Sequence, residues 1–144
     1  MKKIIILVVV IAAIITSCQS NDPNSSNATQ KQIENYFISH RWVSLENIYT
    51  SNSSYYAIKG DTLGFGTISG KLYAKWYSIL DRDLFTYKVE SVSTTTDEVG
   101  ALMYVAVIPG DVSDSFAAYP NGTSAILKRI DNNNILSGQW RLIK

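Results

Sequence analysis

The stretch KLYAKWYSILDRDLFTYKVESV, residues 71–92, holds two alternating segments on either side of a short charged turn. Each segment carries apolar or aromatic side chains at every second position: Leu72, Ala74 and Trp76 in the first, and Phe85, Tyr87 and Val89 in the second. A period of two is typical of an antiparallel strand with one face on a core and the other toward solvent. We therefore predict strands over 71–79 and 84–92, with Asp81-Arg82-Asp83 as a solvated turn between them.

Short segments of the same kind, separated by turn residues, continue along the rest of the chain. They predict further strands over residues 42–49, 55–58, 62–68, 99–108, 124–130 and 135–143. We expect 55–58 to pair with 62–68 across the turn 59–61. Residues 99–108 are apolar at successive positions, which favours a central strand covered on both faces.

The end of the sequence predicts a hairpin. Asp131-Asn132-Asn133-Asn134 consists of residues that tolerate positive φ, and it lies between the last two predicted strands. In the final strand, one face would carry Leu136, Gly138, Trp140 and Leu142.

One short helix precedes the strands. Thr29 is a suitable N-cap, and Ile33, Tyr36 and Phe37 follow at the i, i+3, i+4 spacing of a single helix face. We expect this helix to end near Ser39 or His40.

About seven strands after a single helix favour a mainly β fold, an antiparallel β-barrel that is closed or nearly closed. Closure removes unpaired strand edges, which a domain of this size has little else to cover. The alternative is a two-sheet β-sandwich.

The amino-terminal residues predict export. Lys2 and Lys3 precede an apolar run over 4–15, which is too short to cross about 30 Å of hydrocarbon as a helix. The run ends at Ile15-Thr16-Ser17-Cys18, the only cysteine of the chain. With no second cysteine, an intramolecular disulfide is excluded.

This segment resembles the lipobox of bacterial lipoprotein precursors. The resemblance implies cleavage before Cys18, diacylglycerol on its sulfur, and in many bacteria a further acyl chain, such as palmitate, on the new amino terminus. Two or three acyl chains would hold the protein on its membrane. The alternatives are a secreted protein with Cys18 as a free thiol, or an uncleaved anchor.

The chain accordingly divides into three parts. Residues 1–17 are interpreted as a signal peptide, 18–29 as the lipidated cysteine and a flexible polar tether, and 30–144 as the β-barrel domain. The expected location is the cell envelope, lipid-anchored, at the outer membrane.

The domain resembles small lipocalin-like domains of bacterial lipoproteins. The residues that carry this resemblance are His40-Arg41-Trp42, where a tryptophan opens the first strand after a short helix, and Trp140-Arg141 near the end. Lipocalins proper have glycine two places before that tryptophan, where this chain has His40. The resemblance implies a lipocalin-like barrel with a ligand near its open end.

Several function classes are disfavoured by the composition. Without residues 1–17 the chain has 11 basic and 12 acidic residues, scattered along the sequence, so we expect no nucleic-acid partner. The sole histidine is His40 and the sole cysteine is Cys18, which leaves no catalytic triad and no zinc-type metal site. We therefore expect no enzyme and no cofactor, and we interpret Asp111 and Asp114 as Asx turns in a loop.

Two functions remain open. A binding module would hold a small apolar or amphipathic ligand, with Tyr73, Trp76 and Tyr87 as wall residues. An interaction or structural protein would instead have a filled barrel, with loops 92–98 and 110–123 contacting another envelope protein or a polysaccharide. An interior cavity above about 300 Å³ would favour the first.

Overall fold

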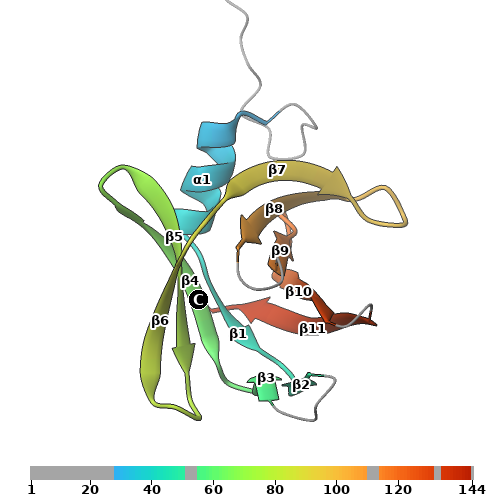
Figure 1. Ribbon diagram of the computed structural model, residues 1–144. Helices are drawn as coiled ribbons and strands as arrows, with labels where there is room; N and C mark the ends of the chain where they lie inside the picture. Colours follow the sequence, from blue (N-terminus) through green and yellow to red (C-terminus); the bar gives the residue numbers. More distant parts are fainter. Residues whose placement is uncertain (1–27, 51–54, 110–113, 132–133, 144) are drawn as a thin grey trace, which may run out of the picture.

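The computed structural model describes residues 28–50, 55–109, 114–131 and 134–143 (Figure 1). The fold is mainly β, with one short helix followed by a nine-stranded antiparallel sheet that curls into a half-barrel, which confirms the predicted lipocalin-like class. The predicted signal peptide, Cys18, nearly all of the tether and Asp111 lie outside the described residues. No helix in the described ranges has the length and apolarity needed to cross a membrane.

The large sheet consists of β1 (Arg41–Ser44), β4 (Thr62–Ile68), β5 (Lys71–Ser78), β6 (Asp83–Lys88), β7 (Ser91–Thr96), β8 (Leu102–Ile108), β9 (Asp114–Ala118), β10 (Ser124–Asp131) and β11 (Asn134–Leu142). Their order across the sheet is β6-β5-β4-β1-β11-β10-β9-β8-β7. A separate two-stranded sheet pairs β2 (Ile48–Tyr49) with β3 (Tyr55–Ala57).

The two edge strands of the large sheet, β6 and β7, are consecutive in the chain. Between them, the amide of Val89 donates to the carbonyl of Leu72 in β5 (3.0 Å), and the amide of Glu90 donates to the carbonyl of Val107 in β8 (2.8 Å). Residues 83–96 thus pair with one end of the sheet and then with the other. The ends meet at this crossing, and the predicted single strand over 84–92 is divided there.

Beyond the crossing, β6 has a neighbour on one side only. It pairs with β5 from Tyr73↔Lys88 to Ser78↔Asp83. On its other edge the amide of Leu84 donates to the side chain of Asp83 instead of to a strand (2.7 Å). The sheet is therefore open along β6.

Helix α1 (Gln30–Ile38) lies over one end of the half-barrel (Figure 1). It begins as predicted: the Thr29 hydroxyl accepts from the amide of Gln32 (3.3 Å), and the Gln32 side chain accepts from the amide of Thr29 (2.7 Å). This capping box satisfies two amides at the start of the helix. Ile33 and Phe37 are buried against the sheet, and Ser39 ends the helix.

Aromatic side chains fill the interior beneath the helix. Ring centroids are 4.8 Å apart for Phe37 and Phe65, 5.0 Å for Trp42 and Phe116, and 5.9 Å for Phe116 and Trp140. Trp42 and Trp140 are each 1% exposed. Both tryptophans therefore belong to the core of the domain.

The terminal hairpin forms as predicted. β10 and β11 pair without a register shift from Ser124↔Arg141 to Asp131↔Asn134. Along β11, Gly138 and Trp140 are buried, and Leu136 and Leu142 pack against the core from the same face.

The predicted pairing of 55–58 with 62–68 is wrong. β3 pairs with β2, while β4 pairs with β1 and β5. The chain changes direction at Gly60, whose φ is +100°, and at Asp61, whose carboxylate accepts from the amide of Ile58 (3.1 Å). The amide of Gly60 donates to the carbonyl of Ser44 (3.0 Å) and the amide of Ser44 to the carbonyl of Asp61 (2.9 Å), so the turn is bonded to the end of β1 instead of closing a hairpin.

The strand predicted over 99–108 forms as β8 (Leu102–Ile108), but its predicted central position in the sheet is wrong. β8 begins at Leu102 and lies next to the edge strand β7, with Tyr104 and Ala106 buried but Val105 and Val107 only partly so. Two segments expected as loops contain strands. β7 (Ser91–Thr96) occupies most of the expected loop 92–98, and β9 (Asp114–Ala118) lies within the expected loop 110–123. Both are rich in Ser, Thr and Ala, and pairing with neighbours rather than an apolar pattern makes them strands.

Gly138 allows the small β2–β3 sheet to pack against β11. A Cβ atom at Gly138 would lie 2.5 Å from Cγ1 of Ile48 and closer still to its Cδ1, and Ile48 is buried. Beside this contact, the amide of Gln139 donates to the Glu46 carboxylate (2.6 Å), and the amide of Leu45 donates to the carbonyl of Gln139 (2.9 Å).

We expect Gly138→Ala to lower the free energy of unfolding by about 1–3 kcal/mol, because the new methyl overpacks against Ile48. In an Ile48→Ala background the same change should cost clearly less. Urea denaturation of the four proteins in the cycle measures this coupling. Gly66→Ala is the control, since its methyl would meet only the end of the Lys75 side chain, at 3.2 Å. Equal costs of Gly138→Ala in both backgrounds would contradict the packing described.

Candidate functional site

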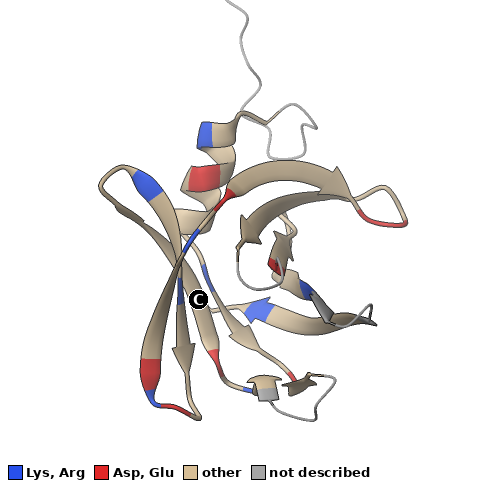
Figure 2. Cartoon of the chain, viewed as in Figure 1, with Lys and Arg blue, Asp and Glu red and all other residues tan. Residues whose placement is uncertain are grey.

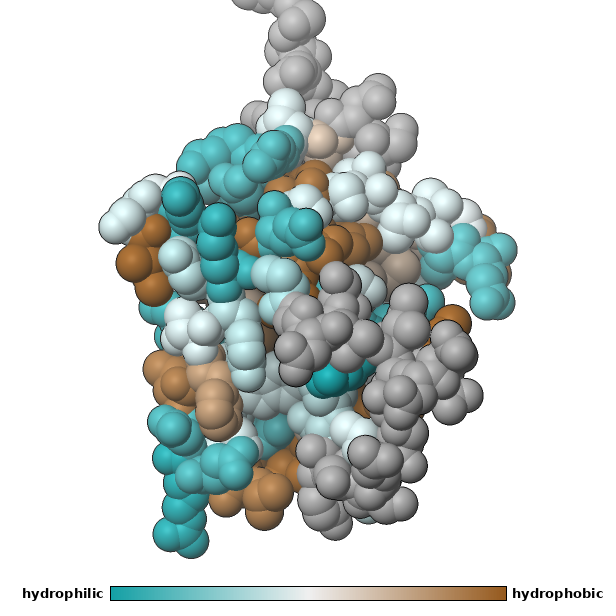
Figure 3. Space-filling view, viewed as in Figure 1, coloured by the Kyte–Doolittle hydropathy of each residue, from teal (hydrophilic) through white to brown (hydrophobic). Residues whose placement is uncertain are grey.

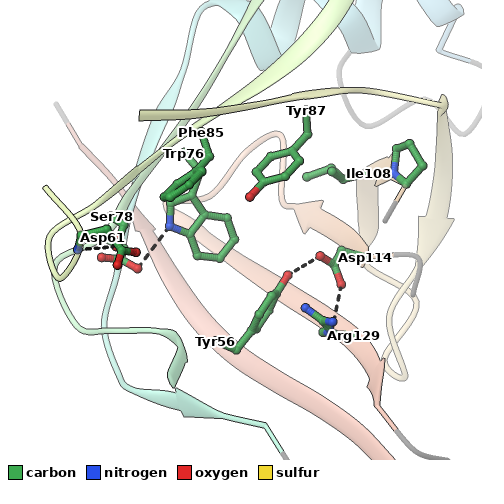
Figure 4. Close-up of a pocket in the computed structure, with 11 residues that line it drawn as sticks. Tyr56, Asp61, Trp76, Ser78, Phe85, Tyr87, Ile108, Asp114 and Arg129 are labelled. Carbon is green, nitrogen blue, oxygen red and sulfur yellow. Dashed lines mark hydrogen bonds and ion pairs between the residues drawn. The ribbon is translucent and has the colours of Figure 1, made fainter. Parts of the chain in front are cut away.

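A cavity of about 510 Å³ lies beside β6, where the sheet is open (Figure 4). Its walls come from β3, β5, β6, the end of β8, β9 and β10, which are far apart in the sequence. The lining residues are Tyr56, Asp61, Trp76, Ser78, Asp81, Phe85, Tyr87, Ile108, Pro109, Asp114 and Arg129. The volume exceeds the roughly 300 Å³ at which small-molecule sites begin.

One wall consists of aromatic rings on β6. Phe85 pairs with Trp76 and Tyr87 with Ala74, so both side chains share the inward face of the sheet. They are nevertheless 37% and 40% exposed. Because no strand continues the sheet beyond β6, their rings face the cavity instead of a packed core.

Trp76 forms the floor of the pocket. Its ring contacts Trp140 edge to face (5.3 Å between centroids) and Tyr56 in the same way (5.5 Å). Its indole N–H donates to Oδ2 of Asp61 (3.1 Å). The floor therefore belongs to the aromatic core on one side and to the cavity on the other.

Asp61 holds this tryptophan in place. The carboxylate is 2% exposed and also accepts from the amides of Ile58 (3.1 Å) and Ile79 (2.9 Å). A buried carboxylate with three N–H donors is well satisfied. Asp61 thus fixes the 58–61 turn and the indole orientation, and its hydrogen-bonding capacity is largely used by the protein itself.

The opposite wall is a polar cluster of Tyr56, Asp114 and Arg129. The Tyr56 hydroxyl donates to Oδ2 of Asp114, and Cζ of Arg129 lies 4.5 Å from the centre of the Tyr56 ring. Nε of Arg129 is 3.9 Å from Oδ1 of Asp114, across paired positions of β10 and β9. Figure 4 shows the three side chains converging at one side of the pocket.

Burial raises the pKa values of three groups in and beside this cluster, Tyr56, Asp114 and Tyr87. Burial raises the pKa of Tyr56 well above its usual value, and the charge and hydrogen bond of Asp114 add to this effect, while Arg129 opposes it. Burial also raises the pKa of Asp114, although the Tyr56 hydrogen bond and Arg129 act in the other direction. The pKa of Tyr87 is raised by burial and by Asp114. Both phenols therefore remain protonated at neutral pH and can donate hydrogen bonds.

Two atoms of the cluster have no hydrogen bond. Oδ1 of Asp114 and Nε of Arg129 are both buried and have no hydrogen-bond partner among the described residues. They face one another at 3.9 Å, which is longer than a hydrogen bond. A buried polar atom without a partner is costly, so this pair is suited to a ligand that supplies one.

Two of the three predicted wall residues line the pocket. Trp76 and Tyr87 do, but Tyr73 does not, because it lies on the face of β5 opposite to Trp76. The interpretation of Asp114 as part of an Asx turn is also wrong, since it lies in β9 and is partly buried.

The sequence analysis missed Tyr56, Asp114 and Arg129 as a site. A signal was present for two of them: Arg129 continues the inward face of Ala125 and Leu127, and Asp114 continues that of Phe116. A charge on an otherwise apolar strand face is unusual and needs a partner. The sequence pattern did not reveal that β9 and β10 are neighbours, and this pairing is what brings Asp114 and Arg129 together.

The described residues contain no group of three or more His, Cys, Asp or Glu side chains that could hold a metal ion. Lys and Arg residues are distributed over α1 and several strands (Figure 2). No protein-family model and no curated protein matches the sequence.

Proposed function

We propose that the protein is a non-enzymatic, membrane-anchored lipoprotein of the bacterial cell envelope that binds a small amphipathic ligand beside β6. The observation that carries the proposal is the cavity of about 510 Å³ with exposed inward rings on one wall and a hydrogen-bonding cluster on the other. Apolar walls with a few converging polar groups are typical of small-molecule sites.

The packing limits the size of the ligand. Trp76 closes the pocket from the interior, and Trp140 and Phe116 occupy the space behind it. A long acyl chain would need a hollow barrel to enter, so a compact, ring-shaped molecule fits better.

A second candidate role is contact with another envelope protein. Apolar side chains are exposed near the tip of the β5–β6 hairpin, where Figure 3 shows hydrophobic residues at the surface. They are Tyr77, Ile79, Leu80 and Leu84. Contiguous exposed apolar surface often marks an interaction site.

The anchor in this proposal rests on the lipobox sequence that ends at Cys18. A chain held there enters the domain through α1, at the end of the half-barrel remote from the β2–β3 sheet (Figure 1). About ten residues separate Cys18 from the domain and span at most roughly 35 Å. A polar tether of this length lets the domain stand clear of the membrane, so the pocket stays accessible to soluble ligands.

Ligand binding can be tested with N-phenyl-1-naphthylamine, a neutral aromatic fluorescent probe. We expect the protein to enhance its fluorescence, and Phe85→Ala or Tyr87→Ala to weaken binding about five- to tenfold, because losing an aromatic contact costs about 1 kcal/mol or more. Tyr73→Ala is the matched control, on the opposite face of the neighbouring strand. The absence of enhancement, or an equal effect of Tyr73→Ala, would contradict binding in this pocket.

Lipidation is tested by expressing the full-length chain and its Cys18→Ser variant in a bacterial host with labelled palmitate. We expect the native chain to be labelled and to sediment with the membranes, and the variant to be unlabelled, since no thiol remains to carry diacylglycerol. Unlabelled native protein in the soluble fraction would rule out the anchor.

A further inference from the structure

We propose that the polar group recognised in this pocket is an uncharged hydroxyl, and that the ligand is a ring-shaped polyol such as a sugar unit, held between Asp114 and Arg129 while its ring packs on the aromatic wall. This inference rests on the proposed binding function and specifies the chemistry of the ligand.

The first support is the pair of unpartnered atoms. Oδ1 of Asp114 can only accept a hydrogen bond when the carboxylate is ionised, and Nε of Arg129 can only donate one. A hydroxyl group does both. Oδ1 and Nε are 3.9 Å apart. If the hydroxyl oxygen lay about 2.7 Å from Oδ1 and about 2.9 Å from Nε, the angle at this oxygen between the two atoms would be roughly 90°. One hydroxyl can therefore bond both atoms once the two side chains turn toward the pocket, since both atoms are buried in the structure.

The second support is the charge of the cluster. The carboxylate of Asp114 and the guanidinium of Arg129 lie side by side, so their charges largely cancel. An anionic ligand group placed between them would be repelled by Asp114 at close range, and a cationic group would be repelled by Arg129. The two other carboxylates that line the pocket already accept hydrogen bonds from the protein: Asp61 accepts three, and Asp81 accepts one from the Ser78 hydroxyl (2.9 Å). A neutral polar group is therefore favoured.

The third support is the arrangement of the rings. Phe85 and Tyr87 occupy alternate positions of one strand, so their side chains stand about 7 Å apart on the same face. Figure 4 shows the Tyr87 hydroxyl directed into the pocket between Trp76 and Asp114. A saturated ring with C–H groups on its face and hydroxyls at its edge can contact the aromatic wall and reach the polar cluster together.

A pair of matched compounds tests the inference by calorimetry on the native protein. Phenyl β-D-glucopyranoside carries hydroxyls on a six-membered ring, and 2-phenoxytetrahydropyran has the same two rings without them. We expect the glucoside to bind at least tenfold more tightly, because a site that hydrogen-bonds a hydroxyl discriminates against an analogue that lacks it. Phenyl β-D-glucuronide, in which a carboxylate replaces the hydroxymethyl group, should bind more weakly than the glucoside.

A matched pair of variants tests the role of Asp114. Asp114→Asn should weaken glucoside binding about tenfold and leave binding of the hydroxyl-free ether unchanged. Asp97→Asn is the control, because Asp97 also accepts a hydrogen bond from a tyrosine, Tyr119 (2.9 Å), but does so at the β7–β8 turn, outside this pocket. If Asp114→Asn does not fold, the compound series on the native protein still decides.

The possible failures are distinguishable. If the ether binds as tightly as the glucoside, the inference is overturned while the proposed binding function stands. If the glucoside, the ether and N-phenyl-1-naphthylamine all fail to bind, both are overturned. Tighter binding of the glucoside that is lost in Asp114→Asn supports the inference.

Discussion

Two consecutive amides determine the shape of this domain. Val89 donates to β5 and Glu90 donates to β8, so the short segment between β6 and β7 joins the two ends of the sheet at one point. On the helix side of that point the chain continues as β7, which pairs with β8. On the other side β6 keeps a free edge, and the pocket lies along it. The same hydrogen bonds that join the sheet ends therefore leave the opening that we propose as a binding site.

The interior is divided in a corresponding way. Beneath α1, the rings of Phe37, Trp42 and Phe116 occupy the space that a ligand cavity would need. Toward the open side, Trp76 marks the boundary, with the core behind it and the pocket in front. Small barrels are usually filled by their own side chains. Here the core side chains fill the interior only as far as the unpaired edge of β6. A ligand in the proposed site would therefore be confined to a compact space beside that edge.

Local patterns predicted local structure well. The Thr29 capping box, the alternation along β5 and the Asn-rich terminal turn each specify their element within a few residues. Alternation reports which face of a strand is buried but not which strand lies beside it, so the crossing at Val89 was missed. The polar cluster was missed for the same reason, since Asp114 and Arg129 meet only through the pairing of β9 with β10.

Amide hydrogen exchange, followed by NMR at single residues, tests the crossing most directly. The alternation of an antiparallel ladder directs the amides of Thr86 and Lys88 to the free edge, and those of Tyr87 and Val89 to β5. Thr86 and Lys88 should therefore exchange rapidly, while Val89 and Glu90 exchange slowly together. If Thr86 and Lys88 were as protected as Glu90, the sheet would be closed along β6, and if Glu90 exchanged as rapidly as they do, the sheet ends would not be joined; either result would contradict the open half-barrel.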